Sequence, residues 1–181
     1  MGTTGNAATT EQHDPADADA PAITWARFWE LVDVLGGEAG TSTCADVEAG
    51  CERLTEVLAA GPVGEIIGFG ERLAEALYRI DQEVFGVLPV AGLSDGGSPL
   101  PQSDDGFLYA RAAAVAAGRR TYESVFGAPD RFAPFTARHC EELLYVHEEA
   151  YERATGEEWD RLTRYDYETC SNRDGWPGLD D

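Results

Sequence analysis

The sequence contains no lysine, so all 13 of its basic residues are arginine. Without lysine the chain cannot form a Schiff base with a carbonyl substrate, and it lacks the lysine that binds phosphate in a P-loop. Basic residues of any kind are few, and 34 aspartates and glutamates outnumber them. The formal net charge is therefore −21 at pH 7. Since this charge repels phosphate groups, it argues against direct binding of nucleic acid or of an anionic membrane surface.

Long apolar runs are absent as well. No run reaches the ~18 residues that a membrane-spanning helix needs, and no apolar signal segment precedes Ile23. The four cysteines form no C-x-x-C pair, and no histidines stand at zinc-ligand spacing beside them. We therefore expect a cytoplasmic protein with reduced thiols, no metal site and no cofactor.

The length of 181 residues fits one domain with a tail at each end. Residues 1–22 are acidic and lack large apolar side chains, which predicts a disordered acidic arm. Residues 23–165 are predicted to form the domain. Residues 166–181 are predicted to be an irregular C-terminal tail, in which Trp176 is the candidate for docking on the domain.

Apolar residues recur at helical spacing almost everywhere between these tails. The pattern predicts a first helix that Thr24 caps and that Gly36 and Gly37 end. Segment 91–103 is rich in glycine and proline, which predicts a loop, and no strand or hairpin is expected. The sequence therefore predicts an all-α, single-domain bundle of about five to six helices. They are expected over residues 25–35, 47–58, 66–84, 104–126 and 140–156, followed by a short helix at 159–165.

Three segments carry a recognisable pattern. They read F-W-E-L at 28–31, S-D-D-G-F at 103–107 and C-E-E-L-L-Y-V at 140–146. Together they resemble the motifs of the bacterial family known as domain of unknown function 4240, over about residues 24–158. The resemblance supports the fold and implies no activity. The chain departs from the family pattern where alanines, instead of an aromatic pair, flank Arg111. If those aromatics line a pocket in the relatives, the pocket of this protein is altered or lost.

Arg111 is the only charged residue between Gly106 and Gly118 in the fourth predicted helix. A helix that is apolar on nearly every side lies inside a bundle, so Arg111 should be buried. Its guanidinium stays protonated and therefore needs a carboxylate or several carbonyl groups as partners. Asp104, two turns earlier on the same stripe, and Asp33 on the first helix are the candidate partners.

Three roles for Arg111 follow from this position. In the first, which we favour, it joins a buried ion pair that fixes the packing of the helices. In the second, its guanidinium binds the carboxylate or phosphate of a ligand, with Tyr109 or Tyr122 nearby. In the third, Asp104 and Asp105 act as metal ligands or as an acid and a base, although neighbours on a helix point about 100° apart.

The other residues with a predicted role have structural functions. Ser103 or Asp104 is expected to cap the fourth helix. His147 lies on an apolar stripe and is predicted to be a hydrogen-bonded core residue, and Cys140 is predicted to be an inert buried thiol. No catalytic residue is predicted. The aromatic candidates are Trp25, Trp29 and Phe107.

Two functional hypotheses remain. The first is a non-enzymatic interaction module whose acidic surface binds a basic protein partner, as immunity proteins and antitoxins do, by analogy of charge alone. The alternative is a small-ligand-binding or catalytic bundle that uses Asp104, Asp105 and Arg111 on an anionic or metal-bound ligand. The sequence leaves the oligomeric state open.

Overall fold

The structure is a computed structural model that describes residues 23–40 and 42–180. The predicted acidic arm, residues 1–22, lies outside the described residues. The helices are α1 (Trp25–Val32), α2 (Gly37–Gly40), α3 (Cys44–Ala59), α4 (Val63–Ile80), α5 (Glu83–Gly86), α6 (Asp104–Ala116), α7 (Arg119–Gly127) and α8 (Glu142–Thr155). Two short strands, β1 (Ser94–Asp95) and β2 (Ser98–Pro99), and the 3-10 turns η2 (Asp33–Leu35), η3 (Pro129–Arg131), η4 (Ala133–Ala137), η5 (Arg173–Gly175) and η6 (Pro177–Asp180) complete the fold.

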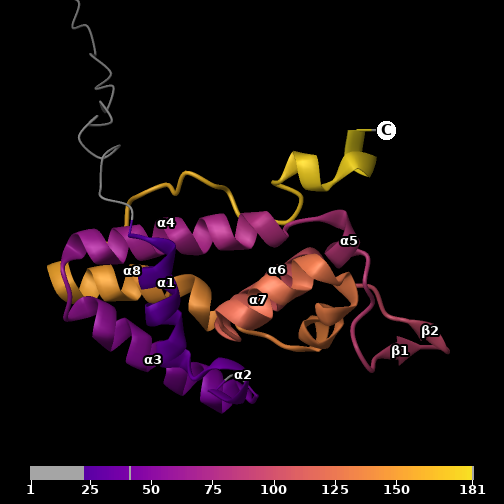
Figure 1. The fold of residues 1–181 in the computed structure, drawn as a ribbon, viewed down its shortest axis with the longest axis horizontal. Coiled ribbons are helices and arrows are strands. Elements are labelled where there is room, and N and C mark those ends of the chain that lie inside the picture. Colours follow the sequence, from indigo (N-terminus) through magenta and orange to yellow (C-terminus); the bar gives the residue numbers. More distant parts are fainter. Residues whose placement is uncertain (1–22, 41, 181) are drawn as a thin grey trace, which may run out of the picture.

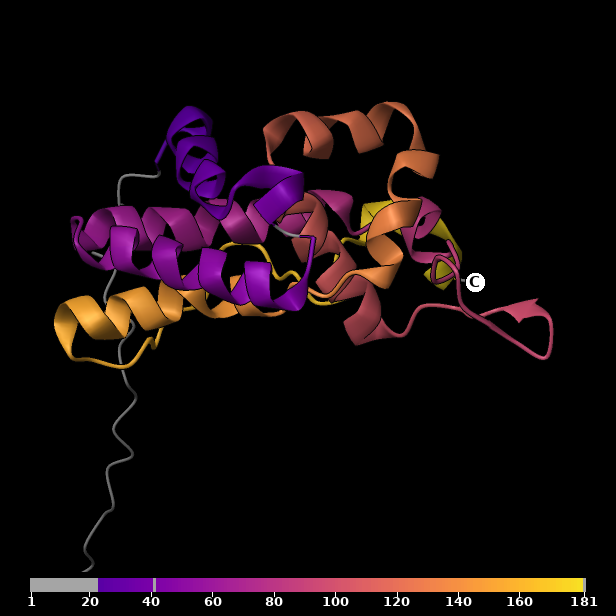
Figure 2. The same ribbon diagram turned by 90° about the horizontal axis from the view of Figure 1, so that it is seen from below.

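The predicted all-α fold is confirmed. Helices α3, α4 and α8 pack side by side and form the body of the molecule (Figures 1 and 2). In Figure 2, α1 and α7 lie on one side of α4 and α8 lies on the other side. Helix α6 packs against α4, α7 and η4. Within the described residues, no helix has both the length and the apolarity needed to cross a lipid bilayer.

The first helix begins and ends where the sequence predicts. The hydroxyl of Thr24 accepts a hydrogen bond from the backbone N–H of Arg27 at 3.2 Å, which caps α1. One face of α1 is buried, including Phe28 and Trp29. After the turn η2, Gly36 adopts a left-handed conformation with φ +87°, which glycine tolerates at little cost.

The expectation of one helix over residues 104–126 is wrong. The helix stops after Ala116, and Gly118 has φ +93° and ψ 166°, a conformation that is essentially restricted to glycine. A new helix, α7, then starts at Arg119. Because of this break, Tyr122 and Arg111 belong to different helices, although both side chains donate hydrogen bonds to neighbouring carbonyl groups of α4, those of Ala76 and Leu77.

Three further segments differ from the expectation. Helix α4 ends at Ile80 instead of continuing through residue 84, because Asp81 leaves helical geometry with ψ 79°. The predicted loop contains the antiparallel hairpin of β1 and β2, in which Gly96 and Gly97 both have positive φ, as a tight hairpin turn requires. Residues 159–165 form no helix.

The chain after α8 returns along α4 and then packs on the body (Figure 1). Its end is irregular apart from η5 and η6. Trp176 packs so closely on Gly86 that a β-carbon there would collide with the indole ring. The ring also meets Phe107 edge-on, with ring centres 6.0 Å apart. The C-terminal segment, residues 166–178, is thus part of the packed structure.

Candidate functional site

The most unusual side chain of the core is that of Arg111, which is fully buried. It lies in the middle of α6, whose residues from Phe107 to Ala116 are nearly all buried. An arginine on such a helix cannot reach solvent from either face, as the sequence predicts. Its polar atoms must therefore find partners inside the protein.

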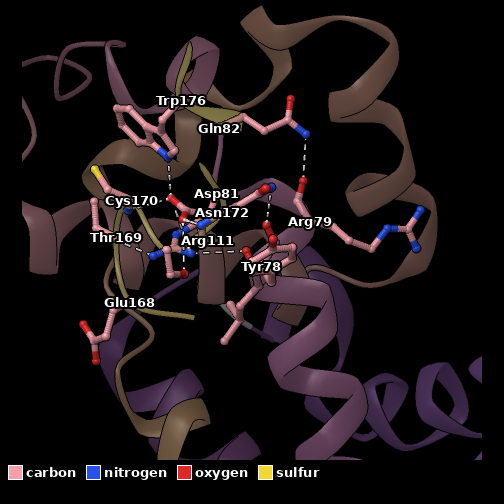
Figure 3. A network of polar contacts seen from close by, with 12 residues as sticks. Tyr78, Arg79, Asp81, Gln82, Arg111, Glu168, Thr169, Cys170, Asn172 and Trp176 are labelled. Atoms are coloured by element: carbon pink, nitrogen blue, oxygen red, sulfur yellow. Dashed lines mark hydrogen bonds and ion pairs between the residues drawn. The ribbon is translucent and has the colours of Figure 1, made fainter. Parts of the chain in front are cut away.

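The guanidinium of Arg111 meets partners from three segments (Figure 3). One terminal nitrogen donates a hydrogen bond to the carbonyl oxygen of Leu77, and the other donates to the hydroxyl of Thr169, both at 3.2 Å. Its Nε has no hydrogen-bond partner among the described residues. The charged group also lies 4.8 Å from the centre of the Phe107 ring, a cation–π contact. Burial lowers the pKa of Arg111 to about 10, so the side chain remains charged at neutral pH.

The carboxylate that faces Arg111 is Asp81, which is also fully buried. Its Oδ1 lies 4.0 Å from a terminal nitrogen of Arg111, close enough for charge attraction but too far for a hydrogen bond. Its hydrogen bonds come from the C-terminal segment instead (Figure 3). The donors are the backbone N–H groups of Cys170 at 3.1 Å and Asn172 at 2.9 Å, the indole N–H of Trp176 at 2.8 Å and, more distant at 3.4 Å, the hydroxyl of Ser171.

The expectation that Asp104 or Asp33 would pair with Arg111 is therefore wrong. The carboxylates of both residues are exposed, and Asp104 contributes only its carbonyl oxygen, which accepts a hydrogen bond from Thr169 at 2.8 Å. Asp81 escaped prediction because it follows directly after a helix, where a polar residue usually faces water. Its burial depends on residues that come 89 to 95 positions later in the chain, and no local sequence pattern predicts such contacts.

This Asp81–Arg111 centre is closed by the protein itself. Thr169, Leu77 and Asp81 occupy the directions in which the carboxylate or phosphate of a ligand would have to approach the guanidinium. The geometry thus favours the role of a buried ion pair that fixes packing, and it ties the C-terminal segment to α4 and α6.

The other candidates of the fourth predicted helix lie apart from this centre. Ser103 caps α6, since its hydroxyl accepts a hydrogen bond from the N–H of Gly106 at 3.1 Å. Asp105 is exposed in the first turn. Tyr109 lies beside His139, and a hydrogen bond with Glu141 raises the pKa of its phenol.

The structure brings three other candidates together elsewhere. Trp25 stacks on Trp29 with ring centres 6.2 Å apart, and Trp29 meets the ring of Tyr122 at 5.0 Å. The hydroxyl of Tyr122 donates a hydrogen bond to the carbonyl oxygen of Ala76 at 2.9 Å, and burial raises its pKa. These rings lie where α1 packs against α7, with Trp29 and Tyr122 buried, whereas the ring of Phe107 faces the guanidinium of Arg111.

His147 is buried, as predicted, but the expected hydrogen bonding is incomplete. Its Nδ1 has no partner among the described residues. The ring lies edge-on to Trp159 at 4.8 Å and against Gly70, where a β-carbon would come within 2.7 Å of it. Burial lowers the pKa of His147 to about 4, so the side chain is neutral in the folded protein at pH 7.

This lowered pKa makes the stability of the fold depend on pH. Unfolded His147 binds a proton with a pKa near 6.5, while the folded protein resists protonation until about pH 4. The contribution of His147 is therefore complete above pH 6.5 and is lost as the pH falls toward 4. At pH 5 the free energy of unfolding should be about 2 kcal/mol lower than at pH 7 because of His147 alone. Urea denaturation at pH 7 and pH 5 should show this loss in the wild type. A smaller loss is expected in His147→Leu, and equal losses in both proteins would contradict the assignment.

The cysteines show no sign of an activated nucleophile. All four lie in the described part of the chain and none is bridged. Cys140 is buried, and a hydrogen bond with the thiol of Cys51, together with burial, raises its pKa well above the usual value. Such a thiol stays protonated and is a poor nucleophile. Over the described ranges, no three histidine, cysteine, aspartate or glutamate side chains are grouped so that they could hold a metal ion.

An acidic groove lies on the exposed side of α8 and has a volume of about 380 Å³. We refer to it as the α8 groove. Tyr145 and Trp159 supply aromatic surface there, and Tyr145 is about half exposed. Partial burial raises the pKa of Glu148, as expected for a carboxylate that has lost part of its water. The groove is lined by Tyr145, Glu148, Glu149, Glu152, Glu158 and Trp159.

A family model described as "Protein of unknown function (DUF4240)" matches residues 24–153. No curated protein and no solved structure matches the chain. The matched range includes Asp81 and Arg111, whereas the segment that donates hydrogen bonds to Asp81 lies beyond it.

Proposed function

This chain belongs to the DUF4240 family of proteins of unknown function, and we propose that it acts as a non-enzymatic interaction module that binds a basic protein partner. The observation that carries this proposal is the α8 groove. Four glutamates line it, while no basic residue does. An immunity-like or antitoxin-like role is the form of this function that the charge suggests by analogy.

The chemistry of the α8 groove suits an arginine or lysine side chain. A guanidinium can form paired hydrogen bonds with a carboxylate and can stack on an aromatic ring at the same time. The groove offers both kinds of group, with Glu148 and Glu158 beside Tyr145 and Trp159. Glu148 is already partly desolvated, so its negative charge is less well stabilised by water. A cation that binds beside it would stabilise that charge, and their attraction is stronger where water is partly excluded.

The charge of the whole chain supports the same partner. A net charge of −21 surrounds the protein with a negative potential, which speeds the approach of cationic proteins and repels acidic ones. Two residues of the predicted polar cluster have partners within the protein. Arg111 is held by Asp81 and Thr169, and Ser103 caps a helix.

A defined peptide tests this proposal directly. A short peptide of alternating arginine and glycine should bind the protein in isothermal titration calorimetry, and a peptide with glutamate in place of arginine should not. The double variant Glu148→Gln/Glu158→Gln should bind about tenfold more weakly, a loss of about 1.4 kcal/mol. Raising the salt concentration from about 50 to about 500 mM should also weaken binding of the peptide to the wild-type protein, because salt screens exposed charges.

A matched control separates the groove from the overall charge. Glu48→Gln/Asp95→Asn removes the same two charges from exposed sites on α3 and β1. This variant should lose about twofold in affinity at most. Equal losses in the two double variants, or affinity that ignores salt, would overturn the groove as the binding site. If the groove variant alone loses affinity for the peptide, both variants can be used to capture proteins from native-host lysate. The partner is expected to be a basic protein that the control variant captures and the groove variant does not.

A further inference from the structure

A second cleft, of about 330 Å³, lies between α1, the end of α4 and α7. Its aromatic lining is Trp25, Trp29, Tyr122 and Phe126, and the charged residues at its edge are Arg79, Arg119 and Glu123. We propose that this aromatic cleft binds a small aromatic carboxylate. The site is separate from the α8 groove and its ligand has the opposite charge, so this proposal is independent of the proposed function.

The walls of the aromatic cleft are held in place before any ligand arrives. Trp29 is nearly buried and contacts the rings of both Trp25 and Tyr122. Tyr122 in turn meets Phe126 edge-on, with ring centres 5.3 Å apart, and its hydroxyl is bonded to the carbonyl oxygen of Ala76. A rigid wall of this kind costs little entropy on binding. Phe126 remains 38% exposed, so aromatic surface is available at the mouth.

Arg79 supplies the group that selects an anion. Its guanidinium lies 5.7 Å from the ring centre of Trp25 and 5.8 Å from that of Phe126. Over the described residues, its side chain makes no hydrogen bond and no ion pair, although the protein is rich in carboxylates. The N–H donors of Arg79 are therefore free to bind the carboxylate of a ligand in a bidentate fork.

The local charge agrees with this selection. Two arginines and one glutamate line the aromatic cleft, which leaves one net positive charge on a protein whose total is −21. The Nε of Arg119 is paired with Glu123 at 2.7 Å, and both side chains are more than half exposed. The described residues show no ion pair between Glu123 and Arg79, since Glu123 pairs with Arg119 instead.

The size of the cleft limits the ligand. Its volume is at the lower end of the ~300–1,000 Å³ that is typical of small-molecule sites. One or two fused rings with a single carboxylate therefore fit better than a nucleotide or a longer peptide. The ring would stack on the aromatic wall, and the carboxylate would point toward Arg79.

Matched ligands test the proposal. In protein-observed NMR or calorimetry, indole-3-carboxylate should bind, and uncharged indole-3-carboxamide should bind about tenfold more weakly. Arg79→Gln should remove this preference and leave carboxamide binding unchanged. Arg120→Gln, at a neighbouring exposed arginine that does not line the cleft, should change neither affinity by more than about twofold. Phe126→Ala should weaken both ligands, because it removes part of the wall.

Several outcomes would overturn the aromatic cleft as an anion site. These are equal affinity for the carboxylate and the carboxamide, unchanged affinity in Arg79→Gln, or no binding at about 10 mM of either ligand. Phenyl phosphate is the third ligand to be tested. If it bound more tightly than indole-3-carboxylate, the assignment of the cleft to aromatic carboxylates would be wrong. Binding of the arginine peptide should be unaffected by a saturating carboxylate, so failure of one proposal leaves the other intact.

Discussion

Replacing Asp81 by alanine should lower the free energy of unfolding by about 3–5 kcal/mol, as measured by urea denaturation at neutral pH. The change leaves the charge of Arg111 buried without the carboxylate that faces it at 4.0 Å. It also removes the acceptor for the N–H groups of Cys170 and Asn172 and for the indole of Trp176. Each of these losses is costly in the interior, where water cannot take the place of the missing partner.

A double-mutant cycle shows whether the two charges depend on each other. Arg111→Met alone should also be strongly destabilising, because it leaves the carboxylate of Asp81 without its counter-charge. The double variant Asp81→Ala/Arg111→Met should lose less stability than the sum of the two single variants, since neither charge then remains buried alone. Asp104→Ala provides the control and should cost less than about 1 kcal/mol, because this carboxylate is exposed. A near-normal stability of Asp81→Ala would contradict the buried pair.

Trp176→Ala should have the second largest effect, about 2–4 kcal/mol of unfolding free energy. The indole fills the space beside Gly86, contacts Phe107 and donates a hydrogen bond to Asp81 at 2.8 Å. Its removal leaves a cavity and opens a path for water to the buried carboxylate. The C-terminal segment should then detach, and limited proteolysis should cleave it faster than in the wild type.

The variant Trp176→Phe separates packing from hydrogen bonding. It retains an aromatic ring beside Gly86 but removes the N–H that reaches Asp81. The loss of unfolding free energy in Trp176→Phe should be about 1.5–3 kcal/mol, the range for a hydrogen bond to a charged group. If Trp176→Ala were as stable and as protease-resistant as the wild type, the C-terminal segment would not hold the Asp81–Arg111 centre closed.

These predictions concern an arrangement in which one part of the chain completes another. Asp81 and Arg111 lie inside the family match at residues 24–153, but the donors that satisfy Asp81 lie outside it. The C-terminal segment is therefore required for the buried carboxylate to be tolerated. Its irregular backbone follows from this role, because its N–H groups point at a side chain instead of forming a helix.

Much of the fold follows from short-range patterns. The caps at Thr24 and Ser103 and the left-handed end at Gly36 depend on residues within one helical turn, so the sequence is sufficient to locate them. The break at Gly118 is missed because a glycine within a helical pattern is compatible with continuing the helix. The hairpin at Gly96 is missed for a similar reason, since its strands are only two residues long.

By itself, the sequence determined the helical class, the strong negative charge and the burial of Arg111. The helical class follows from the periodicity of apolar residues, the charge from the composition, and the burial of Arg111 from its apolar neighbours in the sequence. Each of these signals can be read without knowing which distant residues come into contact. Only the tertiary structure decided that Asp81 faces Arg111 and that Arg79 meets the rings of α1 and α7. The physical reason is distance along the chain. Contacts between residues dozens of positions apart are set by how the helices pack, and that packing leaves no periodic trace in the order of the amino acids.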